Sequence, residues 1–435
     1  MEAILIEILK EMILDNQKKD FLTGTKRDLE VSQLSGKATI CIGVRRCGKS
    51  TYGYQLMKKL LDSGVKKENI LHINFFDNRL HNLDEGSLSN ITEVYFELYP
   101  QKKNSEKIYC FFDEIQEVSG WERYVERIIR TENCEVFITG SSAKMLSKEI
   151  ATQMRGRALS WELFPFSFKE YLRFSGIEPK KDLTSKERLT IQNVFKQYWE
   201  CGGFPEVAGV DKHLRIKIHQ EYFNAILFRD LIERHDISHP KAVTDLAQWL
   251  IDNNSSLYST NKLTGYLKAL GHHAPKSSVS QYLDYFEDAF FLFSVKKYDA
   301  SLSRKNTNPK KIYCVDHAFA ASVSSGILTN TGHFLENLVF NSLRRETSDI
   351  HYYKTATGKE VDFIVKIDRK DLMLVQVSHS LLEPKTRKRE LSALIEAMKE
   401  LNLNHSFVVT SNEEETVESD SGTISIIPAW KFLLR

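Results

Sequence analysis

The sequence predicts a multidomain α/β chain whose first domain is built on a parallel sheet. Three features of the 435 residues indicate this: short apolar runs alternate with helical patterns up to residue 165, helical patterns alone fill the middle, and a second alternation follows residue 312. Near-continuous apolar strands separated by helices are typical of a parallel sheet covered on both faces. At about 100–200 residues per domain, we expect two to four domains.

The elements of the first domain, residues 1–165, come in a regular order. An amphipathic helix occupies the first twenty residues. Strand-like runs rich in β-branched and aromatic residues then alternate with helical patterns. These runs span 38–43, 70–76, 108–113, 135–140 and 158–163. The pattern predicts a sheet with a helix between most of its strands.

The rest of the chain divides into three predicted parts. Residues 166–236 are helical, with one interruption at a Gly-Gly pair. Residues 237–311 hold three helical patterns followed by an apolar strand, which is the order of a winged helix-turn-helix. Residues 312–435 predict a second α/β domain, with helices at 333–345 and 385–401 and strands at 350–354, 361–365 and 372–377.

Composition and charge exclude several classes of protein. Sixty Lys and Arg residues against 58 Asp and Glu leave a net charge of +2, so no chain-wide basic field recruits nucleic acid. The six cysteines form no CxxC pair, which fits a reducing compartment rather than a disulfide framework or a zinc ribbon. No apolar run approaches the roughly 20 residues of a membrane span, and the charged N-terminal helix is not a secretory signal. We therefore expect a cytoplasmic protein without a membrane partner.

A glycine-rich loop follows the first predicted strand and precedes a predicted helix. Its pattern GxxxxGK[ST] predicts binding of a nucleoside triphosphate, because backbone N–H groups and a helix N-terminus hold phosphate oxygens. Lys49 would reach the β- and γ-phosphates, and the Ser50 hydroxyl would bind Mg²⁺. A chance match is the alternative, and the strand and helix on either side argue against it. The predicted ATP-binding residues are Gly43, Val44, Arg45, Arg46, Cys47, Gly48, Lys49, Ser50 and Thr51.

Two carboxylates stand at the end of the apolar strand over residues 108–113. Acids are expected at the carboxyl end of a parallel strand, where ligands bind in open α/β sheets. Asp113 would hold Mg²⁺ through its water shell, and Glu114 would polarise the attacking water as a general base. The alternative is an acidic turn without a catalytic role. The phosphate loop earlier in the chain favours the catalytic interpretation.

Further catalytic candidates follow in the chain. Ser141 or Ser142 would stand near the γ-phosphate and orient water, or else cap the helix that begins near Ala143. A guanidinium group would stabilise charge on the transferred phosphoryl group, from the same chain or from a neighbouring one. The arginine candidates for this role are Arg155, Arg157 and Arg229.

The motifs together resemble those of a known family. In order, they are GVRRCGKST (43–51), FDEIQ (112–116) with Trp121, ITGSSA (138–143), RGR (155–157) with LFPFSFKEY (163–171), GGFPEV (202–207), FLENLVF (334–340) and KEVDFIV (359–365). The chain is similar to the prokaryotic P-loop ATPases of the AAA type that carry a C-terminal domain of unknown function with a restriction-endonuclease-like fold. The resemblance implies an ATPase core, a helical lid over 166–236, a winged helix and a nuclease-like domain over 312–435.

The nuclease-like domain is expected to be degenerate. A nuclease of the PD-(D/E)xK type needs two carboxylates for a metal ion and a lysine that positions water. Glu336 and Asp362 match the helix position and the first strand position. Gln376 and Ser378 stand where the second carboxylate and the lysine are expected, and neither side chain can replace them. We expect a domain kept for binding or assembly, with an active nuclease as the alternative.

Local basic runs are the remaining sign of a polynucleotide partner. A solvated surface has the same appearance, so DNA stays an open partner at this point. The runs are Arg304, Lys305, Lys310 and Lys311 at the predicted wing, and Lys385, Arg387, Lys388 and Arg389 at the start of the last long helix.

These observations predict a Mg²⁺-dependent ATPase whose hydrolysis moves a winged-helix and nuclease-like module, on DNA or in a regulatory assembly. ATP and Mg²⁺ are the expected cofactors. A second copy of the chain is a candidate partner, because an arginine acting in trans needs a neighbour. Two alternatives belong to other classes: a non-catalytic DNA-binding regulator that uses ATP as a structural ligand, and a metal-dependent nuclease.

Overall fold

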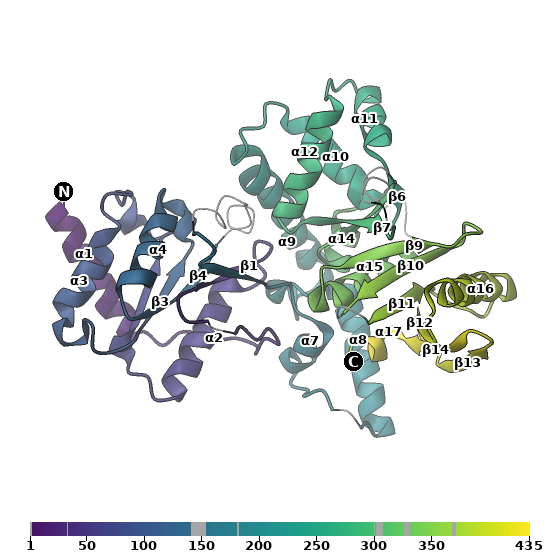
Figure 1. The fold of residues 1–435 in the computed structure, drawn as a ribbon, viewed down its shortest axis with the longest axis horizontal. Helices are drawn as coiled ribbons and strands as arrows, with labels where there is room; N and C mark the ends of the chain where they lie inside the picture. Colours follow the sequence, from purple (N-terminus) through teal and green to yellow (C-terminus); the bar gives the residue numbers. More distant parts are fainter. Residues whose placement is uncertain are drawn as a thin grey trace. The chain divides into compact units, whose positions relative to one another are not determined.

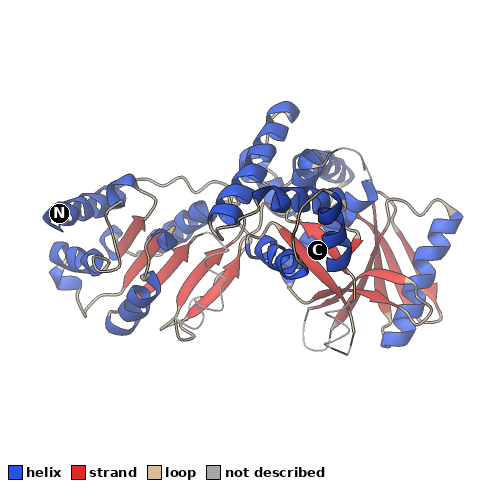
Figure 2. Ribbon diagram, turned by 90° about the horizontal axis from the view of Figure 1, so that it is seen from above, coloured by secondary structure: helices blue, strands red, loops and turns tan. Residues whose placement is uncertain are grey.

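The computed structural model describes residues 2–32, 34–140, 154–180, 182–299, 301, 308–325, 331–367 and 371–435. The chain divides into two compact units, Met1–Leu163 and Phe164–Arg435 (Figure 1). Each unit has a sheet of its own, and helices flank the strands in both units (Figure 2). Each unit can therefore bury a hydrophobic core of its own.

The first unit has a parallel sheet at its centre. Its described strands are β1 (Ala38–Ile42), β2 (Ile70–Asn74), β3 (Ile108–Asp113), β4 (Cys134–Thr139) and β5 (Ala158–Glu162). They pair in the order β2-β3-β4-β1-β5, and every neighbouring pair is parallel. Most residues of β1, β3 and β4 are buried, because helices cover both faces. The predicted α/β fold with a parallel sheet is confirmed, and the strand ends agree to within two residues.

Helices pack on both faces of this sheet. They are α1 (Glu2–Lys18), α2 (Lys49–Asp62), α3 (Ser89–Leu98) and α4 (Trp121–Thr131), with the 3₁₀ turns η1 (Lys67–Asn69), η2 (Asn78–Leu80), η3 (Pro100–Lys102) and η4 (Ile115–Glu117). From β1 the chain passes to β2 at the edge of the sheet, and β3 and β4 then fill the places between β2 and β1. Right-handed crossovers then put α2 on one face and α3 and α4 on the other (Figure 1).

The second unit is built on a mixed sheet. Its described strands are β6 (Leu257–Tyr258), β7 (Leu292–Lys297), β8 (Lys310–Cys314), β9 (Ile350–Lys354), β10 (Glu360–Lys366), β11 (Leu372–Val377), β12 (His405–Thr410), β13 (Glu415–Ser419) and β14 (Gly422–Pro428). They pair in the order β13-β14-β12-β11-β10-β9-β7-β8-β6. The pairs β7 with β9, β11 with β12 and β12 with β14 are parallel.

Helices surround this second sheet. They are α7 (Phe168–Phe174), α8 (Ser185–Cys201), the 3₁₀ turn η5 (Pro205–Val207), α9 (Lys212–Ala225), the π-helix η6 (Ile226–Glu233), α10 (Pro240–Asp252), α11 (Thr260–Ala269), α12 (Lys276–Asp288), α14 (His317–Val323), α15 (Thr331–Glu346), α16 (Pro384–Leu401) and α17 (Ala429–Phe432). Capping boxes at Ser167 and Thr184 fix the starts of α7 and α8. These two helices share a core with Leu338 of α15 and Trp430 of α17, so the first and last helices of the second unit pack into one core.

One sheet contains strands from both residues 237–311 and residues 312–435, which the sequence predicts to be separate parts. β7 pairs with β8 on one side and with β9 on the other, where Lys296 lies opposite His351 and Lys297 opposite Tyr352. The predicted boundary between residues 311 and 312 falls inside β8. Local patterns do not reveal this, because β8 begins with two lysines that look like the end of a polar linker. The pairing of β7 with β9 joins segments that lie far apart in the sequence.

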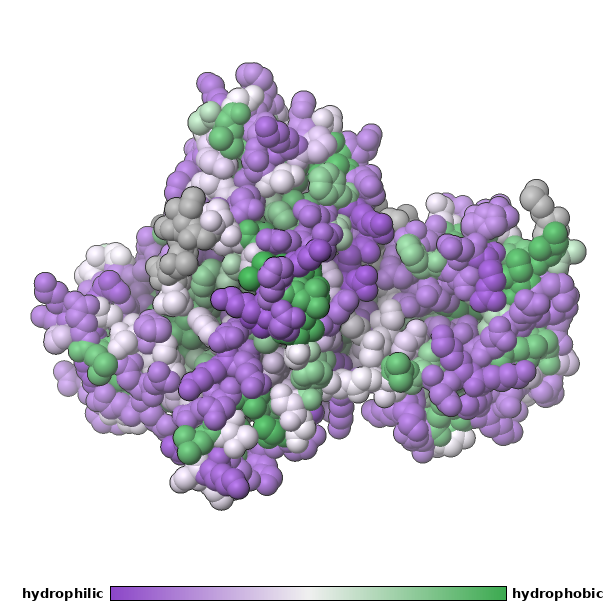
Figure 3. Space-filling model, turned by 180° about the vertical axis from the view of Figure 1, so that it is seen from behind, coloured by the Kyte–Doolittle hydropathy of each residue, from purple (hydrophilic) through white to green (hydrophobic). Residues whose placement is uncertain are grey.

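The face of the molecule that Figure 3 shows is mainly hydrophilic, with apolar side chains in separate patches. Leu22 and Leu382 are the most exposed of the large apolar side chains in the described chain, at 88% and 84%. Scattered exposed side chains of this kind are normal for a folded protein in water. Within the described ranges no helix combines the length and the apolar character that crossing a membrane requires.

Candidate functional site

Two glycines shape the loop between β1 and α2. An added Cβ at Gly43 would lie 2.0 Å from the carbonyl oxygen of Leu163, so no larger residue fits there. Gly48 has a φ of 99°, which residues with side chains rarely adopt, and α2 begins at the next residue, Lys49. The first N–H groups of α2 have no carbonyl partner within the helix. They lie at the end of the loop, where they can hold phosphate oxygens.

Lys49 folds back over this loop. It is 8% exposed, and its Nζ donates hydrogen bonds to the carbonyl oxygens of Gly43 at 3.0 Å and Val44 at 3.1 Å. An ammonium group binds an anion more strongly than a neutral carbonyl, so a phosphate can take over these contacts. Arg27, which no sequence motif marks, is 7% exposed and donates to the Cys47 carbonyl at 2.8 Å. It fixes the loop from a segment that precedes β1.

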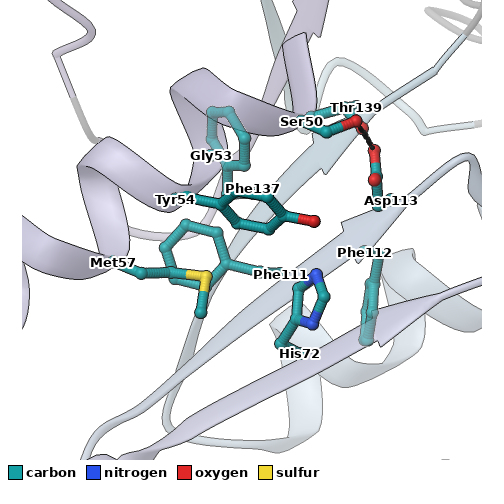
Figure 4. A pocket seen from close by; sticks show the side chains of 10 residues that line it. All are labelled: Ser50, Gly53, Tyr54, Met57, His72, Phe111, Phe112, Asp113, Phe137 and Thr139. Carbon is teal, nitrogen blue, oxygen red and sulfur yellow. Dashed lines mark hydrogen bonds between the residues drawn. The ribbon is translucent and has the colours of Figure 1, made fainter. Parts of the chain in front are cut away.

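Three oxygen-bearing side chains meet beside the loop (Figure 4). The Asp113 carboxylate, at the end of β3, accepts hydrogen bonds from the Ser50 hydroxyl at 3.1 Å and from the Thr139 hydroxyl. The structure thus brings together Ser50 and Asp113, the two predicted metal ligands, and adds Thr139. Thr139 ends β4, which lies between β1 and β3. Only the strand order reveals this position, so sequence reasoning missed it.

This group of oxygens suits a hard divalent cation. Mg²⁺ prefers carboxylate and hydroxyl oxygens and usually binds together with phosphates and water. Asp113 is 6% exposed, and hydroxyl groups are its side-chain partners in the described chain, so a bound cation would compensate its charge. Across the described ranges there is no group of three or more His, Cys, Asp or Glu side chains that could hold a metal. A site here therefore needs phosphate and water as further ligands.

Glu114 follows Asp113 in a strained conformation. Its φ of 56° lies in the left-handed region, which costs a residue with a side chain on the order of 1 kcal/mol. Its N–H donates to the Thr139 carbonyl at 3.0 Å, and its carboxylate accepts a hydrogen bond from the Gln116 amide. Strain of this kind persists only where the surrounding structure enforces it, and it concentrates at functional sites. Gln116, which sequence reasoning missed, orients the carboxylate.

An apolar pocket lies behind these oxygens (Figure 4). It has room for about 10 Å³, which is no more than one water molecule. A nucleotide base does not fit there. The pocket is a gap in the core that supports α2, β3 and β4, and it is lined by Ser50, Gly53, Tyr54, Met57, His72, Phe111, Phe112, Asp113, Phe137 and Thr139.

His72 in this core makes the stability of the first unit depend on pH. It is 6% exposed, and burial, with a smaller effect of Lys19, lowers its pKa to about 4. The unfolded chain takes up a proton near pH 6.5, so stability is complete above that pH and is lost as the pH falls toward 4. Between pH 7.5 and 5, we expect the free energy of unfolding to fall by about 2 kcal/mol more in the wild type than in His72→Phe. Unfolding free energies of both proteins at both pH values measure this, and equal losses would contradict it.

Several predicted residues do not join the group. Ser141 and Ser142 lie outside the described residues. Arg155 and Arg157 precede β5, at the amino end of a strand that runs parallel to β1. The phosphate loop follows the carboxyl end of β1, about 17 Å away along a five-residue strand. A role for these arginines at the phosphates, from the same chain or from a neighbouring one, stays a prediction. Arg229 is exposed on η6 of the second unit.

A second cluster of charged side chains is buried inside the second unit. Lys311 on β8 is 3% exposed, and its Nζ lies 2.8 Å from an Asp362 oxygen and 3.0 Å from oxygens of Glu336 and Glu360. Tyr313 donates to Glu336 at 2.6 Å. Burial alone would lower the pKa of Lys311, but Asp362 and Glu336 raise it well above its usual value. The prediction of Lys311 as a surface charge of a wing is wrong, because β8 directs this side chain into the unit.

The residues at the predicted nuclease-type positions already have hydrogen-bond partners within the second unit. Gln376 accepts a hydrogen bond from the backbone N–H of Asp362 at 3.1 Å and donates one to Glu390 at 2.7 Å. Ser378 donates to the Ser380 carbonyl at 3.0 Å. Burial raises the pKa of Glu390. Glu390 lies on α16, and sequence reasoning missed it because no motif links this helix to the strands.

Acidic side chains pair with two arginines of the other predicted basic runs. Arg304 and Lys305 lie outside the described residues. On α16, Arg387 forms an ion pair with Glu415 at 2.8 Å, and Arg389 forms one with Glu390. Carboxylates that pair with these arginines neutralise the charge that phosphates would need.

Known proteins are similar to this chain over most of its length. Residues 35–172 match the model of an AAA domain, and residues 192–330 and 331–432 match two domains of unknown function, DUF8612 and DUF4143. The Walker-type ATPase PABY2304 of Pyrococcus abyssi is similar in structure, with 16% identity and a TM-score of 0.41 over 66% of this chain and 90% of that one.

Two relatives are similar in sequence over most of their length. The uncharacterized protein MJ1544 of Methanocaldococcus jannaschii is 34% identical over 441 residues, which cover 98% of this chain and 95% of the relative. An uncharacterized protein of Haemophilus influenzae is 30% identical over 341 residues, which cover 78% of this chain and 82% of the relative. The chain therefore belongs to the family of MJ1544, and its residues 35–172 form the AAA domain of a P-loop ATPase.

Proposed function

We propose that this protein is a Mg²⁺-dependent ATPase. The observation that carries the proposal is the contact of Asp113 with the hydroxyls of Ser50 and Thr139, directly beside the loop that Gly43 and Gly48 shape. A buried carboxylate and a hydroxyl at the start of a helix are what a phosphate-bound Mg²⁺ needs. The AAA domain over residues 35–172 supports the same activity.

Each residue of the site has a role in this proposal. Backbone N–H groups of residues 43–51 hold the phosphates, and Lys49 moves its ammonium group from the loop carbonyls to the β- and γ-phosphates. Ser50 and Asp113 hold Mg²⁺, which neutralises phosphate charge when bound. Glu114 accepts a proton from the attacking water, and Thr139 positions the Asp113 carboxylate.

Two further roles complete the proposal. Ser141 orients the attacking water from the chain that follows β4. Arg229 stabilises the charge on the transferred phosphoryl group, from its own chain or from a neighbouring copy in an oligomer. Turnover per molecule that rises with protein concentration would support a role of Arg229 from a neighbouring copy, because a group acting in trans is present only in the oligomer.

Glu114→Gln is expected to bind ATP with affinity near that of the wild type and to lower turnover at least about 100-fold, since the amide cannot accept a proton. Calorimetric titration with ATP measures binding, and steady-state phosphate release measures turnover. Glu117→Gln changes an exposed acid three residues later and is the matched control, with turnover near that of the wild type. Native turnover in Glu114→Gln would overturn the general-base role.

The second unit is proposed to transmit the hydrolysis cycle to a partner. The order α10, β6, α11, α12, β7 and β8 supports a winged helix, a fold used to bind DNA. Charge on α12 does not favour phosphate contact by this helix, which carries Lys276 against Asp284, Glu287 and Asp288. ATP turnover measured with and without duplex DNA decides between a DNA partner and a regulatory protein assembly. A non-catalytic regulator that holds ATP as a structural ligand would release no phosphate under either condition.

The region over residues 312–435 is proposed to be a restriction-endonuclease-like domain that no longer cleaves. The Lys311 ammonium group lies between Asp362 and Glu336, in the position where a divalent cation would have to bind both carboxylates. Gln376 and Ser378 supply neither a carboxylate nor a lysine. Incubation with plasmid and Mg²⁺ or Mn²⁺ tests this, and cleavage that is lost in Asp362→Ala would overturn it.

A further inference from the structure

A pocket of about 520 Å³ lies within the second unit, and no sequence motif marks it. It is bounded by the end of α8, the first turns of α9 and α15, and α14. Its volume falls in the range of about 300–1,000 Å³ that is typical of small-molecule sites. The side chains that matter for its chemistry are Trp199, Glu200, Lys212, Arg215, Ser322 and Phe334.

Arg215 is the unusual member of this set. It is 6% exposed, and its described hydrogen bond runs from Nη1 to the Cys201 thiol sulfur at 2.9 Å. Thiol sulfur is a weak acceptor, and no carboxylate in the described ranges forms an ion pair with this guanidinium group. A buried charge without a partner of opposite sign is costly. An anion in the pocket would supply that partner.

The acids near the pocket are otherwise engaged or exposed. The two carboxylate oxygens of Asp316, at the start of α14, accept hydrogen bonds from the N–H groups of Gly203 at 2.7 Å and Phe319 at 2.8 Å. Glu200 lines the pocket but is exposed to solvent. Lys212 lies one turn before Arg215 on α9 and adds a second positive charge. The pocket therefore has a positive side formed by α9.

Aromatic rings form the apolar part of the pocket lining. Trp199 and Phe334 line the pocket, and the Trp199 indole packs on the His317 ring, with centroids 5.3 Å apart. The His317 Nε2 donates to the Trp199 carbonyl at 3.0 Å, which fixes this wall. The Ser322 hydroxyl is held between His219 Nδ1 at 2.9 Å and the Ala318 carbonyl at 2.8 Å. The lining thus combines two cations from α9 with the flat apolar surfaces of two aromatic rings.

We infer that this pocket binds a small organic anion, namely a carboxylate or phosphate monoester attached to an aromatic body. Arg215 forms a two-pronged pair with the anionic group, as guanidinium groups do with carboxylates and phosphates, and Lys212 adds attraction. Trp199 and Phe334 contact the aromatic body. The lining residues all belong to the second unit, and the site does not depend on the proposed ATPase activity.

The experiment uses the full chain with Lys49→Ala, so that the phosphate loop does not contribute to the signal. Titration calorimetry compares 1-naphthyl phosphate, 1-naphthoate and the neutral 1-naphthalenemethanol. We expect one of the two anions to bind at least 10-fold more tightly than the neutral compound, and the better anion identifies the ligand class. Equal affinities of all three, or no heat from either anion at millimolar concentration, would overturn the inference.

Variants separate binding from folding. Arg215→Met is expected to weaken binding of the anion at least 10-fold while leaving the melting temperature of the ligand-free protein unchanged or higher, because it removes an uncompensated buried charge. Arg215→Lys keeps the charge without the fork and should retain part of the affinity. Lys217→Met, at an exposed position of α9, is the matched control with unchanged affinity. Unchanged affinity in Arg215→Met, or a melting temperature lowered by several degrees, would assign Arg215 a structural role instead.

Discussion

Replacing Lys49 by alanine is expected to lower the affinity for ATP at least about 100-fold and to bring phosphate release down to background. Lys49 supplies the positive charge at the phosphate loop through its contacts with Gly43 and Val44, which a phosphate can replace. Charge-assisted hydrogen bonds contribute about 1.5–3 kcal/mol each, so the loss of two accounts for this factor. Titration calorimetry with ATP and Mg²⁺ measures the affinity.

The control for this variant is Lys58→Ala on the same helix. Lys58 is exposed, and its described contact is an ion pair with Asp62 at 2.9 Å, which contributes little to stability. We expect its affinity for ATP to equal that of the wild type. Near-native ATP affinity in Lys49→Ala would show that the loop does not hold the phosphates, and the proposed function would fail with it.

Replacing Lys311 by methionine is expected to lower the free energy of unfolding of the second unit by about 3–5 kcal/mol. The substitution leaves Asp362 and Glu336 buried without the cation that lies 2.8 Å and 3.0 Å from them. Removing one partner of a buried ion cluster is more harmful than removing all partners, because the remaining charges stay desolvated. Differential scanning calorimetry of the full chain records the shift in the unfolding transition of the second unit.

Two comparisons test whether charge is the cause. Lys310→Met changes the preceding residue of β8, which takes no part in the cluster. It should change the free energy of unfolding of the second unit by less than about 1 kcal/mol. Adding Glu336→Gln and Asp362→Asn to Lys311→Met removes the unpaired charges and should restore about half of the loss or more. A loss below 1 kcal/mol in Lys311→Met would show that the carboxylates find compensation elsewhere.

Much of the nucleotide site follows from local sequence. The phosphate loop, Ser50 and Asp113 are predictable because a glycine-rich turn between a strand and a helix, and an acid at a strand end, are local patterns. The parallel arrangement of the sheet is predictable because each strand is a short apolar run. Thr139 and Arg27 are not, since their place in the site depends on strand order and on a segment without periodicity.

The charged cluster of the second unit shows why the rest could not be predicted. Lys311 follows Lys310 and a polar, basic segment in the sequence. It therefore looks like part of a solvated linker. Its partners Glu336 and Asp362 are brought to it by a helix and a mixed sheet that form only when the unit folds. Arg215 is similar, because its burial depends on the packing of four helices.

The pairing of β7 with β9 limits how this protein can be divided into fragments. A fragment that stops at residue 330 would leave the outer side of β7 with unsatisfied amides and carbonyls, a template on which other chains can add strands and aggregate. It would also strip Tyr313 of its stacked neighbour Phe340, whose ring centroid lies 4.4 Å away. Expression trials are therefore best designed to break the chain near residue 163, where one compact unit ends and the other begins.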